Sequence, residues 1–288
     1  MLTRQFFLGC ALWGYKPWVG ELFPPGSRPS DFLRLYGERF TAVEGNTTFY
    51  SVPDGATIAR WVADTPPGFQ FCPKLPQTLT HAGALTGAIA EASRFIRHMQ
   101  GLGDRLGPLL VQLPPRYSPT QFQDLAQFLT EIARLNAELA VEVRHLDWFA
   151  APHCDRLGDL LTQLGVGRVL LDTRPVYEVP DDPQVGAERK KPRVPVTLQT
   201  TSDFTIIRYI SHPTWSMNLS FVPTWLPHIQ AALQSGRRVY CFVHCPIEAR
   251  SPGNARELQT WLERQGVELP PLPWTELQDP PQQLSLHF

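Results

Sequence analysis

The strongest constraint on the fold of this 288-residue chain is a regular alternation of short apolar runs with longer amphipathic stretches. Near-continuous apolarity suits parallel strands that are buried on both faces. The runs predict eight strands: Phe6–Cys10, Thr41–Asn46, Phe69–Lys74, Pro108–Leu113, Glu138–Arg144, Gly167–Asp172, Phe204–Ile210 and Arg238–His244. Eight strands that alternate with helices predict an α/β fold, a (β/α)₈ TIM barrel, built as a single domain over residues 1–288.

Two segments interrupt the alternation. Residues 173–201 follow the sixth predicted strand and are mostly polar and rich in proline, which predicts a long polar loop. Residues 269–288 form a Pro-rich tail, which we expect to be extended and to lie across the barrel. A doubly wound open sheet is the alternative architecture. It is disfavoured because residues 9–14, after the first strand, do not form a GxGxxG phosphate loop.

Charge and cysteine content narrow the functional classes. The chain has 26 Lys and Arg against 27 Asp and Glu, a net charge of −1, which excludes a polycation that coats nucleic acid or a membrane. The net charge does not exclude a local basic patch. No apolar run approaches the ~18 residues of a membrane span. Five scattered cysteines without a CxxC pair, and no signal-peptide pattern after Met1, predict a reduced, cytoplasmic protein.

Side-chain parity selects the residues that face the barrel interior. Residues two apart in a strand face the same way, and one parity of a barrel strand faces inward. In the fifth strand Leu139, Val141 and Val143 suit the helix side, so the interior receives Glu142 and Arg144. The same reasoning places polar residues inside at the carboxyl ends of the other strands: Glu44, Asn46, Lys74, Gln112, Asp172 (with Arg174 just beyond), Arg208 and His244.

Buried charges of this kind have two explanations. An unpaired charge inside a barrel costs several kcal/mol, so these residues pair in a closed ring, reach water, or bind a ligand. The carboxyl mouth is where barrel enzymes place their active sites. Four cations are predicted to bind an anionic ligand, together with two amides: Lys74, Arg144, Arg174, Arg208, Asn46 and Gln112.

The remaining polar and aromatic residues suggest catalysis on a phosphorylated or nucleotide-like small molecule. Glu44, Glu142 and Asp172 are candidates for the general acid or base, and His244 for a proton carrier. Ligand contacts are also expected from a histidine and from aromatic rings that stack on sugars or bases: His81, Trp13, Tyr15 and Trp148. The alternative for the rings is packing on loops or over the barrel top.

Other functions stay open. Paired carboxylates and aromatic rings are also the ingredients of a glycoside hydrolase. A nucleic-acid-binding barrel, with or without a divalent metal, is a third interpretation. No cofactor is predicted, because parity separates Cys241 from His244, and a divalent metal is the alternative. The basic run Arg189–Arg193 is either a solvated face or a cover that touches phosphates. No membrane partner is expected.

Several motifs carry a family resemblance over nearly the whole chain. They are Gly9-x-x-x-Trp13-x-Tyr15-x-x-Trp18, Phe40-Thr-Ala-Val-Glu44-Gly-Asn46-Thr-Thr-Phe49-Tyr50, Phe69-x-Phe71-x-x-Lys74, Leu106-Gly-Pro-Leu-Leu-Val-Gln112-Leu-Pro-Pro115, Val141-Glu142-Val-Arg144-His-x-x-Trp148 and Asp172-Thr-Arg174. In these the chain resembles the YecE-like family, also called domain of unknown function 72. The resemblance implies a TIM barrel without an established activity. The interpretation as a hydrolase or lyase therefore rests on the charged residues alone.

The chain departs from that family pattern in its last two strands. Relatives carry an Arg-x-His-Gly-like stretch after the seventh strand, where this chain has Arg208-Tyr-Ile-Ser211. Relatives also carry paired Asn at the end of the eighth strand, where this chain has His244-Cys245. The resemblance therefore implies an altered contribution of these two strands to the site.

Overall fold

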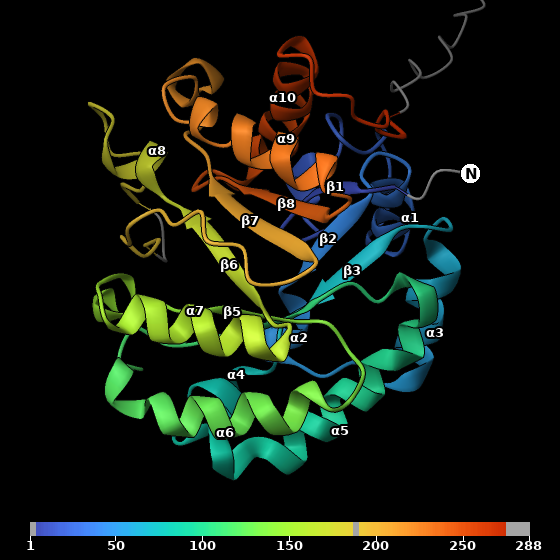
Figure 1. Cartoon of the computed structure of the whole chain (residues 1–288). Coiled ribbons are helices and arrows are strands. Elements are labelled where there is room, and N and C mark those ends of the chain that lie inside the picture. The colour runs from blue at the N-terminus through green and yellow to red at the C-terminus, as the bar shows by residue number, and fades with distance from the viewer. Residues whose placement is uncertain (1–3, 187–189, 275–288) are drawn as a thin grey trace, which may run out of the picture.

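The computed structural model describes residues 4–186 and 190–274. In these residues strands and helices alternate along the chain (Figure 1). The strands are β1 Phe6–Cys10, β2 Ala42–Gly45, β3 Gln70–Pro73, β4 Leu109–Gln112, β5 Leu139–Glu142, β6 Gly167–Asp172, β7 Phe204–Ile210 and β8 Arg238–His244. The α-helices are α1 Phe32–Gly37, α2 Thr47–Tyr50, α3 Gly55–Asp64, α4 Gln77–Thr80, α5 Ile89–Met99, α6 Phe122–Ala133, α7 His153–Leu164, α8 Arg174–Tyr177, α9 Leu226–Gln234 and α10 Ser251–Arg264.

The eight predicted strands all form. Four have the predicted bounds, and the other four are shorter by a residue or two at their ends. Two helix starts differ in how they are capped. The Asp54 side chain caps α3 by accepting a hydrogen bond from Thr57 N at 2.7 Å, as expected of an N-cap aspartate. The Ser118 side chain makes no such cap, because a short 3₁₀ turn precedes α6.

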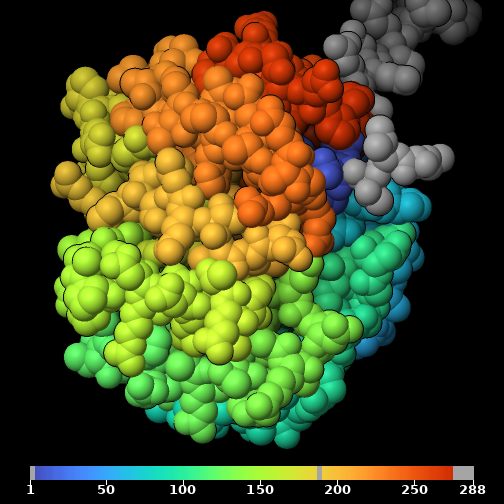
Figure 2. Space-filling view, in the orientation of Figure 1, coloured from blue at the N-terminus to red at the C-terminus, as the bar shows by residue number. Residues whose placement is uncertain are grey.

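All described strand pairs are parallel, and they form two hydrogen-bonded sheets. One sheet has six strands in the order β1-β8-β7-β6-β5-β4, and the other contains β2 and β3. The predicted continuous ladder of eight strands is therefore not observed. The α/β architecture with parallel strands is confirmed, with helices lying outside the strands: α9 and α10 on one side, and α5, α6 and α7 on the other (Figure 1). In the space-filling view, the upper part of this face is formed by residues coloured orange to red, which include α9 and α10, and the lower part by residues coloured green, which include α6 and α7 (Figure 2).

A few backbone hydrogen bonds join the two sheets along both edges of the β2–β3 pair. Between β1 and β2, Thr41 N donates to Leu8 O at 3.1 Å. Gly9 lets these strands approach, since a Cβ there would lie 1.8 Å from Ala42 O. Between β3 and β4, Leu75 N donates to Leu110 O at 2.9 Å. The β2–β3 pair is thus a neighbour of β1 on one side and of β4 on the other.

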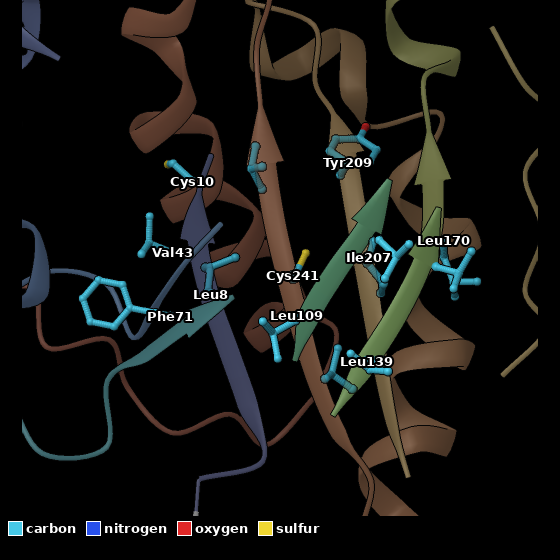
Figure 3. Packing of buried hydrophobic residues seen from close by; sticks show 14 of the residues in the cluster. Leu8, Cys10, Val43, Phe71, Leu109, Leu139, Leu170, Ile207, Tyr209 and Cys241 are labelled. Atoms are coloured by element: carbon cyan, nitrogen blue, oxygen red, sulfur yellow. The ribbon is translucent and has the colours of Figure 1, made fainter. Parts of the chain in front are cut away.

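Two apolar layers follow the alternation of side chains along the strands. The layer between strands and helices includes outward-facing residues of most strands, such as Leu8, Val43 and Leu139 (Figure 3). A second cluster fills the space enclosed by the strands, where the rings of Phe7 and Tyr240 stack with centroids 4.8 Å apart. The inward-facing parity is therefore the one that carries the polar residues at the carboxyl ends of β2, β3, β4, β5, β7 and β8.

The two irregular segments are described only in part. Within residues 173–201, α8 is a short helix, and the other described residues contain no α-helix or strand. Arg189 lies outside the described residues. In the predicted tail, residues 275–288 also lie outside them, while residues 269–274 are without helix or strand. Arg4 donates hydrogen bonds to the Pro270 and Pro271 carbonyls, at 3.3 and 2.8 Å. No helix in the described ranges is long and apolar enough to cross a membrane.

Candidate functional site

Six strands deliver a polar side chain to one buried cluster at their carboxyl ends. The cluster contains Glu44 from β2, Lys74 after β3, Gln112 from β4, Glu142 from β5, Arg208 from β7 and His244 from β8. All six are buried, which matches the inward-facing parity expected for them. Arg144, two residues beyond Glu142, joins the same cluster from the β5 loop.

The Arg208 guanidinium is the centre of this cluster. Its Nε and Nη2 donate to the two oxygens of Glu44 at 2.6 and 2.9 Å, a bidentate arrangement. Its Nη1 donates to Glu142. Arg208 therefore holds together two carboxylates, one from β2 and one from β5. Burial would lower the pKa of Arg208, but Glu142 and Glu44 outweigh it and raise that pKa.

A second layer of donors surrounds the two carboxylates. Lys74 Nζ lies 2.8 Å from Glu44 Oε1 and 2.9 Å from Gln112 Oε1. Arg144 donates from Nε to Glu142 at 2.6 Å and from Nη2 to Gln112 at 2.8 Å. The closed ion-pair ring, which was one explanation of the buried charges, is present in this form. It contains three cations and two carboxylates, so it carries a positive excess.

The pKa values follow from burial and from these neighbours. Burial alone would raise the pKa of Glu142, but Arg208 and Arg144 outweigh it and lower the pKa to about 2. The pKa of Glu44 is lowered well below its usual range because Arg208 and Lys74 likewise outweigh burial. Burial, assisted by Arg208, lowers the pKa of Lys74 to about 8. Both carboxylates are therefore ionised at neutral pH.

His244 lies beside this ion-pair cluster as a neutral imidazole. Burial lowers its pKa to about 3 despite the nearby Glu44 carboxylate. Its Nε2 is 3.2 Å from Glu44 Oε2 and 3.2 Å from Arg208 Nη2. A neutral ring satisfies one of these contacts at a time, by donating to Glu44 or by accepting from Arg208.

A cavity of about 400 Å³ opens above the cluster. Its polar lining combines cluster members with groups from three loops: Lys74, Gln112, Arg144, Arg208, His244, Asn46, Lys190, Lys191 and Glu248. Phe49 and Tyr50 from α2 add aromatic surface. A second hollow of about 520 Å³ lies at the opposite, amino-terminal ends of β5 and β7, where Glu138 is already paired with Arg238. The charged cavity is therefore the candidate site.

Comparison with known proteins places the chain in a family. A family profile described as "Protein of unknown function DUF72" matches residues 7–277. The chain is 31% identical over 285 residues to the UPF0759 protein YecE of Escherichia coli strain K12, covering 98% of this chain and 100% of that protein. This chain belongs to the DUF72 family. The family resemblance expected from the sequence motifs is thereby confirmed.

Solved structures share the fold of this DUF72 protein. A DUF72 family protein from Enterococcus faecalis V583 is 15% identical with a TM-score of 0.64, covering 90% of this chain and 98% of that one. A xylose isomerase domain containing protein from Salmonella typhimurium LT2 is 12% identical with a TM-score of 0.51, covering 91% and 97%. At these identities the likeness concerns the fold alone.

The inward orientation expected for Asp172 is wrong. Register places Leu171 opposite Arg208, so Leu171 lines the cavity and Asp172 faces the helix layer. The Asp172 carboxylate accepts a hydrogen bond from Trp225 Nε1 at 2.9 Å and pairs with Arg174 Nη2 at 2.7 Å. Asp172 and Arg174 thus stabilise the junction between β6 and the segment before α9, and they do not line the cavity.

The aromatic residues expected at the mouth lie elsewhere. Trp148 is fully buried and donates from Nε1 to Tyr117 O at 2.8 Å. Trp13 packs edge-on against Trp61, and Tyr15 packs edge-on against Trp18. These three rings fit the packing alternative and do not line the cavity.

His81 lies at the edge of the site. Its ring contacts the ring of Phe49, one of the cavity residues, with centroids 5.2 Å apart. Burial, followed by the nearby Arg144 cation, lowers the pKa of His81. Asn46 lines the cavity, and its Nδ2 donates to Ala11 O at 2.8 Å.

Three charged residues of the cavity lining were not predicted as site members: Lys190, Lys191 and Glu248. Lys191 belongs to the basic run for which a role over the mouth was an alternative, so its signal was present but ambiguous. Glu248 follows β8 by four residues, in a loop where parity gives no orientation. No group of three or more His, Cys, Asp or Glu in residues 4–186 and 190–274 is arranged to hold a metal ion.

Proposed function

We propose that this DUF72 protein binds a phosphorylated or otherwise anionic small molecule in the cavity above Arg208. The observation that carries the proposal is the charge of the lining. Lys74, Arg144, Arg208 and Lys191 line it, whereas Glu248 is the one carboxyl group among its described lining residues. Glu44 and Glu142 lie outside the lining and are already neutralised by ion pairs. An anion would balance the excess positive charge, and Arg and Lys are suited to phosphate oxygens.

Lys191 gives this proposal its clearest support. Within the described residues, no ion pair or hydrogen bond engages the Lys191 ammonium, although its backbone N–H donates to Gln184 Oε1 at 2.6 Å. Burial, then Arg208, lowers the pKa of Lys191, as expected of a cation held near other cations. A ligand anion would supply the counter-charge that the protein does not.

The proposal includes the architecture of a single (β/α)₈ barrel domain. Its support is that the β2–β3 pair is joined by backbone contacts to both β1 and β4, the two edge strands of the six-stranded sheet. In a barrel of this type the carboxyl ends of all strands surround one mouth. The cavity lies at that mouth.

The proposed function is enzymatic, of the hydrolase or lyase type. His244 is buried and neutral, contacts Glu44 and lines the cavity, which is the position of a general base. With a pKa of about 3 it is a weak base, and the negative charge of a bound anion would raise that pKa. Glu44 would orient the imidazole. The phenyl ring of Phe49 offers a surface for a sugar or base attached to the phosphate.

The Glu44–Glu142 carboxylate pair, on which the glycoside hydrolase alternative was based, does not support that alternative. Such an enzyme needs one carboxylic acid that is protonated near neutral pH. Glu44 and Glu142 both have lowered pKa values and are bound to the same guanidinium. Neither of them is therefore placed to donate a proton at neutral pH.

Ligand binding tests the proposal. We expect inorganic phosphate, sugar phosphates or nucleoside monophosphates to raise the melting temperature, while the matching neutral sugars and nucleosides do not. A ligand at 100 times its Kd adds about 2.7 kcal/mol of stability. Lys191→Ala and Arg144→Ala should each weaken binding about tenfold to a hundredfold, since each charge-assisted hydrogen bond contributes about 1.5–3 kcal/mol.

The matched control for binding is Arg134→Ala. Arg134 is the exposed C-cap residue of α6, pairs with Glu131 at 3.1 Å and is not among the residues that line the cavity. It removes the same charge from the protein, so its ligand affinity should equal that of the wild type. Equal affinity in Lys191→Ala and Arg144→Ala would contradict the proposed site.

A further inference from the structure

Glu248 is the one carboxyl group in the cavity lining that lies outside the Arg208 ion-pair cluster. It begins the 3₁₀ turn Glu248–Arg250 after β8. Trp18 Nε1 donates to its backbone oxygen at 3.2 Å, which fixes the position of the turn. One side-chain oxygen, Oε1, is buried and makes no hydrogen bond within the described residues.

The charged surroundings of Glu248 are mixed. Lys191 approaches from the loop after β6, and Glu44 from β2. The titratable groups of Cys10, Tyr36 and Cys245 also face it, and burial raises the pKa of each of these, so they are neutral near pH 7. Burial, the main cause, also raises the pKa of Glu248 to about 7.

The protonation state of Glu248 decides what it can offer a ligand. An ionised carboxylate only accepts hydrogen bonds and repels an anion, whereas a protonated carboxyl donates one. A buried oxygen without a partner makes the ionised form expensive. An anion that enters the cavity beside Glu44 adds further negative charge, which favours the protonated form still more.

We propose that protonated Glu248 donates a hydrogen bond to the anionic ligand of the mouth cavity, so that ligand binding takes up a proton. This inference rests on the proposed function and makes it more specific. The ligand is an oxyanion that binds to the cations of Lys74, Arg144 and Lys191 and to one neutral carboxyl group. Binding then strengthens as the pH falls through neutrality.

Sulfate is the appropriate probe, because it does not titrate in this pH range whereas phosphate does. Calorimetric titrations at pH 7 in buffers of different ionisation enthalpy give the number of protons taken up. We expect the wild type to take up about half a proton at pH 7, because Glu248 is already about half protonated there, and its sulfate affinity to fall by about tenfold per pH unit above the Glu248 pKa. An infrared difference spectrum with and without sulfate should show a gain of protonated carboxyl, and this needs no variant.

Glu248→Gln is the decisive variant, since the amide keeps the shape and a donor but cannot titrate. We expect proton uptake at pH 7 to fall to about a tenth of a proton, which Lys74 supplies, and a sulfate affinity that is nearly flat between pH 6 and 7.5. Proton uptake near pH 8 should persist, because Lys74 titrates there with the same sign. Arg134→Ala, the surface control, should behave as the wild type.

The outcomes separate this inference from the proposed function. Sulfate binding that requires Arg144 and Lys191 but shows no uptake at pH 7 would overturn the role of Glu248 and leave the anion site standing. Unchanged uptake in Glu248→Gln would have the same consequence. No sulfate binding by the wild type at pH 6 would overturn both.

Discussion

Replacing Arg208 with methionine should lower the free energy of unfolding by about 3–5 kcal/mol. Methionine keeps much of the side-chain volume but leaves two buried carboxylates without their shared guanidinium. Glu44 retains Lys74 and Glu142 retains Arg144, so the cluster is weakened and not abolished. Urea unfolding at pH 7 measures the loss. The difference from the wild type should narrow in acid, where protonation removes the uncompensated charges.

Arg134→Met is the control for this measurement. Its partner is an exposed glutamate on the same helix, and such surface pairs contribute about 0–1 kcal/mol. A loss below about 1 kcal/mol in Arg208→Met would show that the ion-pair cluster contributes little to the stability of the folded chain.

The second large effect is a loss of folding stability in acid that is caused by His244. Its pKa is about 3 in the folded protein and about 6.5 in the unfolded chain, so the unfolded state binds more protons between these values. The contribution of His244 to the free energy of unfolding is therefore fully present above pH 6.5 and declines as the pH falls. Between pH 6.5 and 4.5 the decline is about 2–3 kcal/mol, at about 1.4 kcal/mol per unit.

His244→Gln isolates this contribution. Glu248 acts in the opposite direction, since its raised pKa makes the folded state bind more protons between about 4.5 and 7. Both proteins contain Glu248, so its effect cancels in the difference between their free energies of unfolding. That difference should shift by about 2–3 kcal/mol in favour of the variant as the pH falls from 6.5 to 4.5. An imidazole NMR signal of His244 that titrates near pH 6.5 in the folded protein would refute the prediction.

The sequence was most informative where a strand has a strict two-residue period. Leu139, Val141 and Glu142 sort onto the expected faces, because apolar residues occupy only one parity of the end of β5. β6 lacks this contrast: Val169, Leu170 and Leu171 are all apolar, so parity there depends on register with β7. Register is a tertiary property, which explains why Asp172 was assigned to the wrong face.

Side-chain parity does not predict which loop residues belong to the site. Glu248 and Lys191 reach the cavity from the segments after β8 and β6, where no period relates sequence position to direction. The prediction that Trp148 contacts a ligand was wrong for another reason. An indole ring is equally suited to a ligand site and to a hydrophobic core, and the Trp148 N–H donates to the Tyr117 carbonyl. Burial, which decides between these roles, depends on the packed helices.

The order of the strands also bears on how the chain is made. β1 pairs along its whole length with β8, with Phe6 opposite Val239, so one edge of β1 has no partner until almost all of the described chain has been synthesised. Arg208 likewise follows Glu44 by 164 residues. Ribosomes add about 5–20 residues per second, so about 8–33 seconds pass between the addition of Glu44 and that of Arg208. Nascent fragments that stop before β7 therefore contain the carboxylates of the mouth without the cation that binds them together.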